Sequence, residues 1–154
     1  MRRRRLLLGL LAAAAIGTAA AAGGLPRLAD LRPLAAPIRQ SGEPLIVLFT
    51  TPGCPHCEQV RSHYLAPRLA AGALVREVDI SSRARLVDAQ GRATTEAEFA
   101  RGLGVRAVPA VLLLDARGEP LADALLGSDT AGFYEGYLEA RLAQARRQLG
   151  ATRP

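Results

Sequence analysis

The sequence of 154 residues contains no lysine and no tryptophan, and it has only two cysteines and two histidines. Without the four arginines at positions 2–5, sixteen arginines remain against fourteen acidic residues, a net charge of +2. These arginines are scattered rather than gathered into a basic stripe, so nucleic-acid binding is not expected. Two cysteines cannot form the disulfide framework of a small stapled protein, and a ring between positions 54 and 57 constrains the unfolded chain little. A purely structural disulfide would therefore gain little stability here.

The first 22 residues have the pattern of an export signal peptide. Residues 2–5 are all arginine, residues 6–17 form an apolar stretch and residues 18–22 are small. Ala20 and Ala22 offer a cleavage site before Gly23. The alternative is an uncleaved membrane anchor, although about a dozen strongly apolar residues is short against the ~20 of a bilayer span. The paired arginines also permit twin-arginine export. We expect the protein in a bacterial periplasm, either free or tethered to the membrane and facing it.

The rest of the chain is long enough for one globular core. Periodicity predicts the order strand, helix, strand, helix, strand, strand, helix. These elements lie at residues 44–50, 55–69, 73–80, 95–104, 108–114, 120–126 and 128–149. A lead-in segment at 23–43 can hold a short helix, and residues 81–92 are expected to be irregular. The pattern predicts an α/β three-layer sandwich, a mixed central sheet flanked by helices, in one domain at 44–150.

Local signals mark the ends of several elements. Thr94 or Thr95 can cap the second helix, and Glu98 stands in capping-box position to Thr95. Turn chemistry at 115–119 predicts a hairpin between the third and fourth strands. The last helix is expected to begin at a cap on Ser128 or Asp129 and to stop near Gly150. Its predicted apolar face comprises Phe133, Tyr137, Leu138 and Leu142, and further aromatic core candidates are Tyr64 and Phe99.

The run Cys54-Pro55-His56-Cys57 lies where the first strand gives way to the first helix. A helix N-terminus presents unpaired N–H groups and partial positive charge, which stabilise a thiolate at Cys54. Cys57, one turn further on, is placed to resolve a mixed disulfide. Pro55 is tolerated because its missing N–H would be unpaired there anyway. Protonated His56 would stabilise the thiolate further and make the disulfide more oxidising. We predict a thiol-disulfide oxidoreductase with these four residues as its catalytic centre.

Other functions compete with this interpretation. Cys54, His56 and Cys57 together could bind Cu(I) or Zn(II) in a metal carrier, but a fourth ligand is not evident. His63, the other histidine, is expected on a helix surface. A tethered binding module with incidental thiols is a further alternative. Glu58 beside the centre is expected to be a solvated acid of the first helical turn. We expect no metal and no cofactor.

Residues 49–57, residues 104–109 and the hairpin after them resemble the thioredoxin-like superfamily, over roughly 43–149. The resemblance implies that Pro109 is cis and lies against the disulfide, and that Val108 offers its backbone to an extended substrate. The export signal and the segment ending at 91–95 are similar to periplasmic thioredoxins of the SoxW type, which are linked to sulfur oxidation. The Pro55-His56 pair is instead similar to that of DsbA oxidases, although the domain is too short for their large helical insertion.

Two positions depart from the thioredoxin pattern. Leu48 stands where thioredoxins place a buried acid that assists proton transfer, and Gly53 stands where they have tryptophan. Proton handling and redox poise are therefore open. The expected partners are proteins with disulfides or thiols and a membrane redox protein that supplies or removes electrons. We expect a reductase, with a disulfide-donating oxidase of DsbA type as the alternative.

Overall fold

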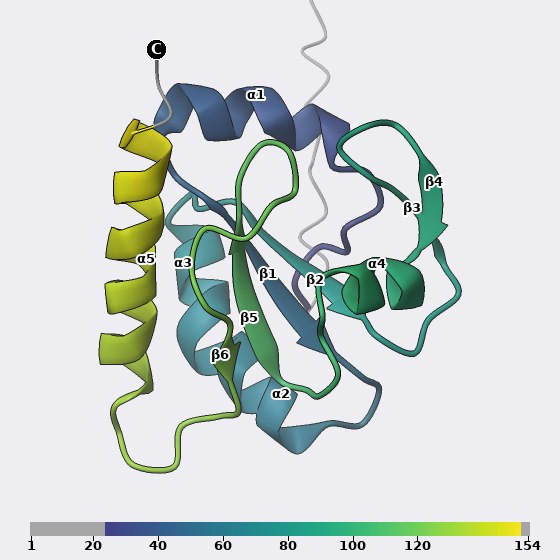
Figure 1. Cartoon of the computed structure of the whole chain (residues 1–154). Helices are drawn as coiled ribbons and strands as arrows, with labels where there is room; N and C mark the ends of the chain where they lie inside the picture. The colour runs from purple at the N-terminus through teal and green to yellow at the C-terminus, as the bar shows by residue number, and fades with distance from the viewer. Residues whose placement is uncertain (1–23, 152–154) are drawn as a thin grey trace, which may run out of the picture.

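The computed structural model describes residues 24–151, and the predicted signal peptide lies outside them. Within this range the chain forms the predicted α/β sandwich, with a mixed sheet at the centre and helices on both faces (Figure 1). The sheet consists of β1 (Leu45–Thr50), β2 (Val75–Asp79), β5 (Ala110–Leu114) and β6 (Leu125–Leu126) in the order β2-β1-β5-β6. β1 pairs parallel to β2 and antiparallel to β5, and β6 adds antiparallel to β5.

β1 is an inner strand of the sheet, between β2 and β5, and all six of its residues are buried. Side chains of successive strand residues point to opposite faces, so this one strand takes part in two cores. Val47 and Phe49 belong to the core that also contains Ile38 and Leu112. Ile46 and Leu48 belong to the core on the opposite face. That second core also contains Val60, Leu65, Leu138 and Leu142. The continuous apolar run in the sequence is therefore explained by burial on both faces.

Helices cover both faces of the sheet. On one side lie α1 (Arg32–Ser41) and α4 (Glu96–Gly102), and on the other the helix after β1 and α5 (Tyr134–Ala151). α1 falls in the lead-in segment and buries Leu34 and Ile38. The helix after β1 runs without a break through α2 (Pro55–Val60), the π-helical η1 (Arg61–Leu65) and α3 (Ala66–Ala70). α4 begins at the expected capping box, because Thr95 accepts from the Glu98 N–H and the Glu98 carboxylate accepts from the Thr95 N–H.

The expectation of an irregular segment at 81–92 was wrong in part. β3 (Arg85–Val87) and β4 (Ala93–Thr95) form a separate antiparallel pair. β3 also bonds to the lead-in segment, since the Val87 N–H donates to Ala29 O and the Leu31 N–H donates to Val87 O. Two strands of three residues each are too short to produce a period-2 signal. The contact of β3 with the lead-in segment, several elements earlier in the chain, leaves no local pattern either.

The predicted fourth strand at 120–126 is shorter than expected. Only β6 and an isolated bridge between Pro120 and Leu114 continue the ladder. The last helix also starts later than predicted, at Tyr134, and ends at Ala151 rather than at Gly150. Gly132 has φ +77°, a left-handed conformation that a helix cannot contain, so the turn at Asp129 does not lead directly into α5.

The late start of α5 changes which side chains are buried. Phe133 is 65% exposed and Tyr137 is 60% exposed, so both were wrong as core candidates. Leu138 and Leu142 are buried as predicted, and Tyr134, which the prediction missed, joins them on the buried face. Tyr64 and Phe99 are partly buried at the edges of the two cores. No helix between residues 24 and 151 is long and apolar enough to cross a membrane.

Candidate redox site

The cysteine pair lies where β1 turns into α2. Thr51, Pro52 and Gly53 form the turn, and Gly53 has φ +69°, which favours glycine at this position. Cys54 is the N-cap of α2, with extended backbone angles, and Pro55 occupies the first helical turn, where no N–H is required. The site of the predicted thiolate is therefore the start of a helix that points its unpaired N–H groups toward the sulfur.

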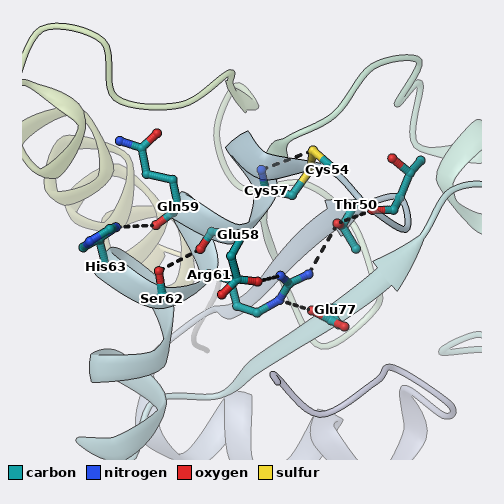
Figure 2. A network of polar contacts seen from close by, with 10 residues as sticks. Thr50, Cys54, Cys57, Glu58, Gln59, Arg61, Ser62, His63 and Glu77 are labelled. Carbon is teal, nitrogen blue, oxygen red and sulfur yellow. Dashed lines mark hydrogen bonds and ion pairs between the residues drawn. A yellow bond between two sulfur atoms is a disulfide. The ribbon is translucent and has the colours of Figure 1, made fainter. Parts of the chain in front are cut away.

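Cys54 and Cys57 are joined by a disulfide, with their Cα atoms 5.2 Å apart. The Sγ atom of Cys54 accepts a hydrogen bond of 3.2 Å from the backbone N–H of Cys57 (Figure 2). The two sulfurs differ in access, since Cys57 is 0% exposed and Cys54 is partly exposed. An external thiol or disulfide can therefore approach the pair from the Cys54 side.

His56 is exposed on α2, between the two cysteines in sequence. Its Nδ1 atom lies 2.9 Å from the hydroxyl of Ser128, in the loop before α5. The same loop is held to the helix at two further points: the Gln59 side chain donates to Asp129 O at 3.3 Å, and the Tyr64 hydroxyl donates to the Asp129 carboxylate at 2.6 Å. The loop is thus fixed beside the cysteine pair from a position about 70 residues away in sequence.

A half-buried ionic cluster joins the same helix to β2. Arg61 donates through Nε to the Glu77 carboxylate at 2.8 Å, and its guanidinium also contacts Glu58 and, at 3.4 Å, the hydroxyl of Thr50 (Figure 2). Burial lowers the pKa of the Arg61 guanidinium, but the hydrogen bonds and charges of Glu77 and Glu58 outweigh burial and raise it. Arg61 is therefore a permanent cation, and Glu58 is ion-paired rather than only solvated.

The remaining predicted site residues lie at the start of β5 and beneath the helix. The Val108–Pro109 peptide bond is cis, Val108 is partly buried and Pro109 is buried. Pro109 O accepts a hydrogen bond from the Gly127 N–H, next to Ser128. Leu48 is fully buried in the core under α2. His63 lies on the exposed surface, with Nδ1 3.1 Å from Gln59 O.

A shallow hollow of about 370 Å³ opens beside Cys54. It is lined by the turn before the helix, by Cys54 and Pro55, and by Glu58 and Arg61. In the part of the chain that the structure describes, no group of three or more His, Cys, Asp or Glu side chains is placed to hold a metal ion. The site thus has one accessible sulfur, one buried sulfur and charged groups beside them. Thiol-disulfide exchange requires an accessible sulfur whose thiolate is controlled by its surroundings.

A redox-active cysteine pair at the start of a helix, on a mixed sheet, defines a class: domains that exchange disulfides with other thiols. A family model described as a thioredoxin-like domain matches residues 35–141, and the chain belongs to this family. The family and the Cys54–Cys57 disulfide together support a thiol-disulfide oxidoreductase.

Solved structures have the same fold at low sequence identity. Thioredoxin NaTrxh from Nicotiana alata is 17% identical, with a TM-score of 0.52 over 82% of this chain and 98% of that chain. Mitochondrial thioredoxin 3 from Saccharomyces cerevisiae, in its oxidized form, is 17% identical, with a TM-score of 0.51 over 77% and 93% of the two chains. At this identity the likeness is one of fold. A search of curated proteins found no match.

The sequence had indicated the cysteine pair but not the groups that surround it. Arg61 and Glu77 come from η1 and β2, and Asp129 comes from the loop before α5. Contacts between residues so far apart depend on the register of the strands and the packing of the helices. Only the spacing of Arg61, four residues after Cys57, offered a signal, because it places the arginine on the same helix face.

Proposed function

We propose that the protein is an exported thiol-disulfide oxidoreductase that mainly reduces disulfides in partner proteins. The observation that carries the proposal is the asymmetry of the cysteine pair: Cys54 is accessible at a helix start, and Cys57 is buried within reach of it. The helix start stabilises the Cys54 thiolate, and only the thiolate attacks a disulfide.

The proposed reaction has two steps. The Cys54 thiolate attacks one sulfur of a partner disulfide, forms a mixed disulfide and releases the other partner sulfur as a thiolate, which takes up a proton. The Cys57 thiol then loses its proton and attacks Sγ of Cys54. This attack breaks the mixed disulfide, releases the second partner thiol and leaves the Cys54–Cys57 disulfide. Two electrons and two protons pass from the dithiol to the partner disulfide, so no cofactor is required.

Partner binding is proposed at the surface around Cys54. Val108 lies directly before Pro109 at the start of β5, and we expect its backbone to pair with an extended segment of the partner. Pro55 and His56 lie on the exposed start of α2 and would contact the same segment. The hollow lined by Cys54 and Glu58 provides room beside the reacting sulfur.

A reductase must be reduced again after each turnover. We propose a membrane redox protein as the electron donor, because an exported pair would otherwise be oxidised by its surroundings. The compact domain and the likeness to periplasmic thioredoxins of the SoxW type favour this direction. Alkylation of cells before lysis measures the redox state of the pair. A mostly reduced pair supports the proposal, and a mostly oxidised pair with a potential near about −120 mV would make the protein a disulfide donor instead.

The proposed location is the periplasm, on the basis of the signal-like residues 1–22. Cell fractionation with N-terminal sequencing is the test. A mature N-terminus near Gly23 in the periplasmic fraction is expected, and full-length protein in the membrane fraction would indicate a tether. Full-length protein in the cytosol would contradict export.

The activity itself is tested by insulin reduction with dithiothreitol as electron source, beside anaerobic elemental analysis. We expect catalysed precipitation of insulin that is lost in Cys54→Ser, and less than stoichiometric copper or zinc. Tight, stoichiometric metal together with slow insulin reduction, and loss of the metal in His56→Ala, would replace the proposal with a metal carrier.

A further inference from the structure

An ionic cluster whose charges do not cancel joins the helix that begins at Cys54 to strand β2. Arg61 bridges the carboxylates of Glu58 and Glu77, so one guanidinium faces two acids. The side chains of Arg61 and Glu77 are only 15% and 13% exposed, whereas Glu58 is 59% exposed. The cluster therefore keeps a net negative charge in a place where solvent screens it less than on an open surface.

Three features place this charge close to the reacting sulfur. The backbone N–H of Arg61 donates to Cys57 O, one helical turn back, and the backbone N–H of Glu58 donates to Cys54 O at 3.1 Å. Glu58 and Arg61 also line the same hollow as Cys54 (Figure 2 shows their carboxylate and guanidinium on this helix). Cys54 and the cluster thus share one helix face and one opening to solvent.

The fold holds Arg61 and Glu77 in this arrangement from both sides. Glu77 pairs in register with Leu48 of β1, so its side chain lies on the sheet face that Leu48 shares with the helix. Arg61 is the first residue of the π-helical turn η1. Such π-helical turns are rare, and those inside α-helices occur frequently at functional sites. The ion pair between Arg61 of η1 and Glu77 of β2 therefore fixes the helix against the sheet.

We propose that Glu77 and Arg61 are positioning residues that set the reduction potential of the Cys54–Cys57 pair, and that the net negative cluster makes the pair more reducing. The inference deepens the proposed function and rests on it. A negative charge near Cys54 disfavours its thiolate and hence the dithiol form, so the disulfide becomes the more stable state. The negative charge of the cluster thus acts against the helix start and His56, which both stabilise the Cys54 thiolate.

The other charged groups around the pair do not cancel this effect. On β2, Asp79 is largely buried, and its carboxylate accepts from the N–H and hydroxyl of Ser81. Being an acid, it brings no positive charge that could offset the cluster. Arg106, in the segment before β5, is exposed to solvent, where its charge is well screened. His56 is exposed and hydrogen-bonded to Ser128.

The experiment measures the equilibrium of the pair with glutathione in the mature protein and four variants. Glu77→Gln and Glu58→Gln remove a negative charge and should make the pair more oxidising. Arg61→Gln removes the positive charge and should make it more reducing. We expect a threefold to tenfold change in the equilibrium constant, about 15–30 mV, in opposite directions for the two kinds of variant. Arg61→Lys keeps the charge and should stay near the wild-type value.

Arg68 provides matched controls: its side chain is 18% exposed, and its guanidinium bridges Glu135 and Glu139, away from the cysteines. Arg68→Gln and Glu139→Gln break a comparable cluster and should leave the potential unchanged. Because a merely structural role would lower stability in every variant without opposite shifts in potential, shifts of one sign or none in the Arg61 and Glu77 variants would overturn the inference. The potential is measured without a partner protein, so failure of wild-type insulin reduction would overturn the proposed function separately.

Discussion

The backbone N–H of Cys57 donates a 3.2 Å hydrogen bond to the Sγ atom of Cys54. This bond joins the N-cap of α2 to the residue three positions later, in the way that a serine or aspartate side chain caps a helix. In the dithiol form the same geometry would place a backbone donor against the Cys54 thiolate. Hydrogen bonds to a charged group favour the charged form, so this contact assigns the attacking role to Cys54.

The roles of the two cysteines can be separated by trapping. In Cys57→Ser the accessible thiol remains but cannot be resolved, so mixed disulfides should accumulate. In Cys54→Ser the remaining thiol is 0% exposed and should react slowly. Incubation with glutathione disulfide followed by intact-mass measurement is the test, and we expect one added glutathione on Cys57→Ser only. Faster labelling of Cys54→Ser would reverse the assignment.

His56 is expected to raise the reduction potential. Its ring is exposed on the first turn of α2, and a protonated imidazole there favours the thiolate over the disulfide. His56→Ala should therefore make the pair more reducing, by up to about 30 mV for a tenfold change in equilibrium constant. Ser128→Ala removes the hydrogen-bond partner of the ring but not the ring, so its shift should be smaller. An equal or larger shift in Ser128→Ala would show that the position of the ring, rather than its charge, matters.

Much of the fold follows from local patterns that the sequence displays. The apolar run of β1 is explained by burial on both faces, and the capping box of α4 lies where Thr95 and Glu98 predicted it. The cysteine pair was identified because a short motif and its place after a buried strand point to the same chemistry. In each case the signal lies within about one helical turn or one strand of the feature that it predicts.

What the sequence did not predict depends on contacts between distant segments. β3 is held by the lead-in segment as well as by β4, and neither partner can be identified from the three residues of the strand. The ion pair of Arg61 and Glu77 requires a helix and a neighbouring strand to be in register. The helical spacing of Phe133 predicts that it lies in the core. The left-handed Gly132 makes the helix begin later, and Phe133 is exposed.

The capping box at the start of α4 allows a stability prediction. Thr95→Ala removes the acceptor for the Glu98 N–H and should lower the free energy of unfolding by about 1 kcal/mol. Thr94→Ala is the matched control. The Thr94 hydroxyl donates to the exposed Glu98 carboxylate and does not cap a backbone N–H of the helix. Its effect should stay within about 0.5 kcal/mol. Urea unfolding of both variants measures the difference, and equal losses would show that the cap contributes no more than the surface contact. The reduction potential should not change in either variant.

The hydrogen bonds that Asp129 accepts in the loop beside the cysteines should weaken at acid pH, when its carboxylate is protonated. The hydrogen bond from the Tyr64 hydroxyl is the main cause that lowers the pKa of the Asp129 carboxyl, and the N–H groups of Gly132 and Ala131 act in the same direction against the effect of burial. A folded-state pKa below the unfolded value means that the carboxylate stabilises the fold at pH values above the unfolded pKa of about 3.9. This contribution is lost as the pH falls through the lower, folded-state pKa.

Asp129→Asn should therefore be less stable than the wild type at neutral pH, and the difference should shrink as the pH falls below about 4. Tyr64→Phe removes the main cause of the shift, so the pKa of Asp129 should rise toward its ordinary value, which NMR titration of the carboxyl carbon can follow. Tyr137→Phe is the control, because Tyr137 is 60% exposed on α5 and is not among the groups that shift the Asp129 pKa. A stability difference for Asp129→Asn that is constant from pH 7 to pH 3 would show that the ionised carboxylate does not hold the loop. In that case the bond between His56 and Ser128 would have to depend on the Gln59 contact instead, since that side chain is the other tie between the helix and Asp129.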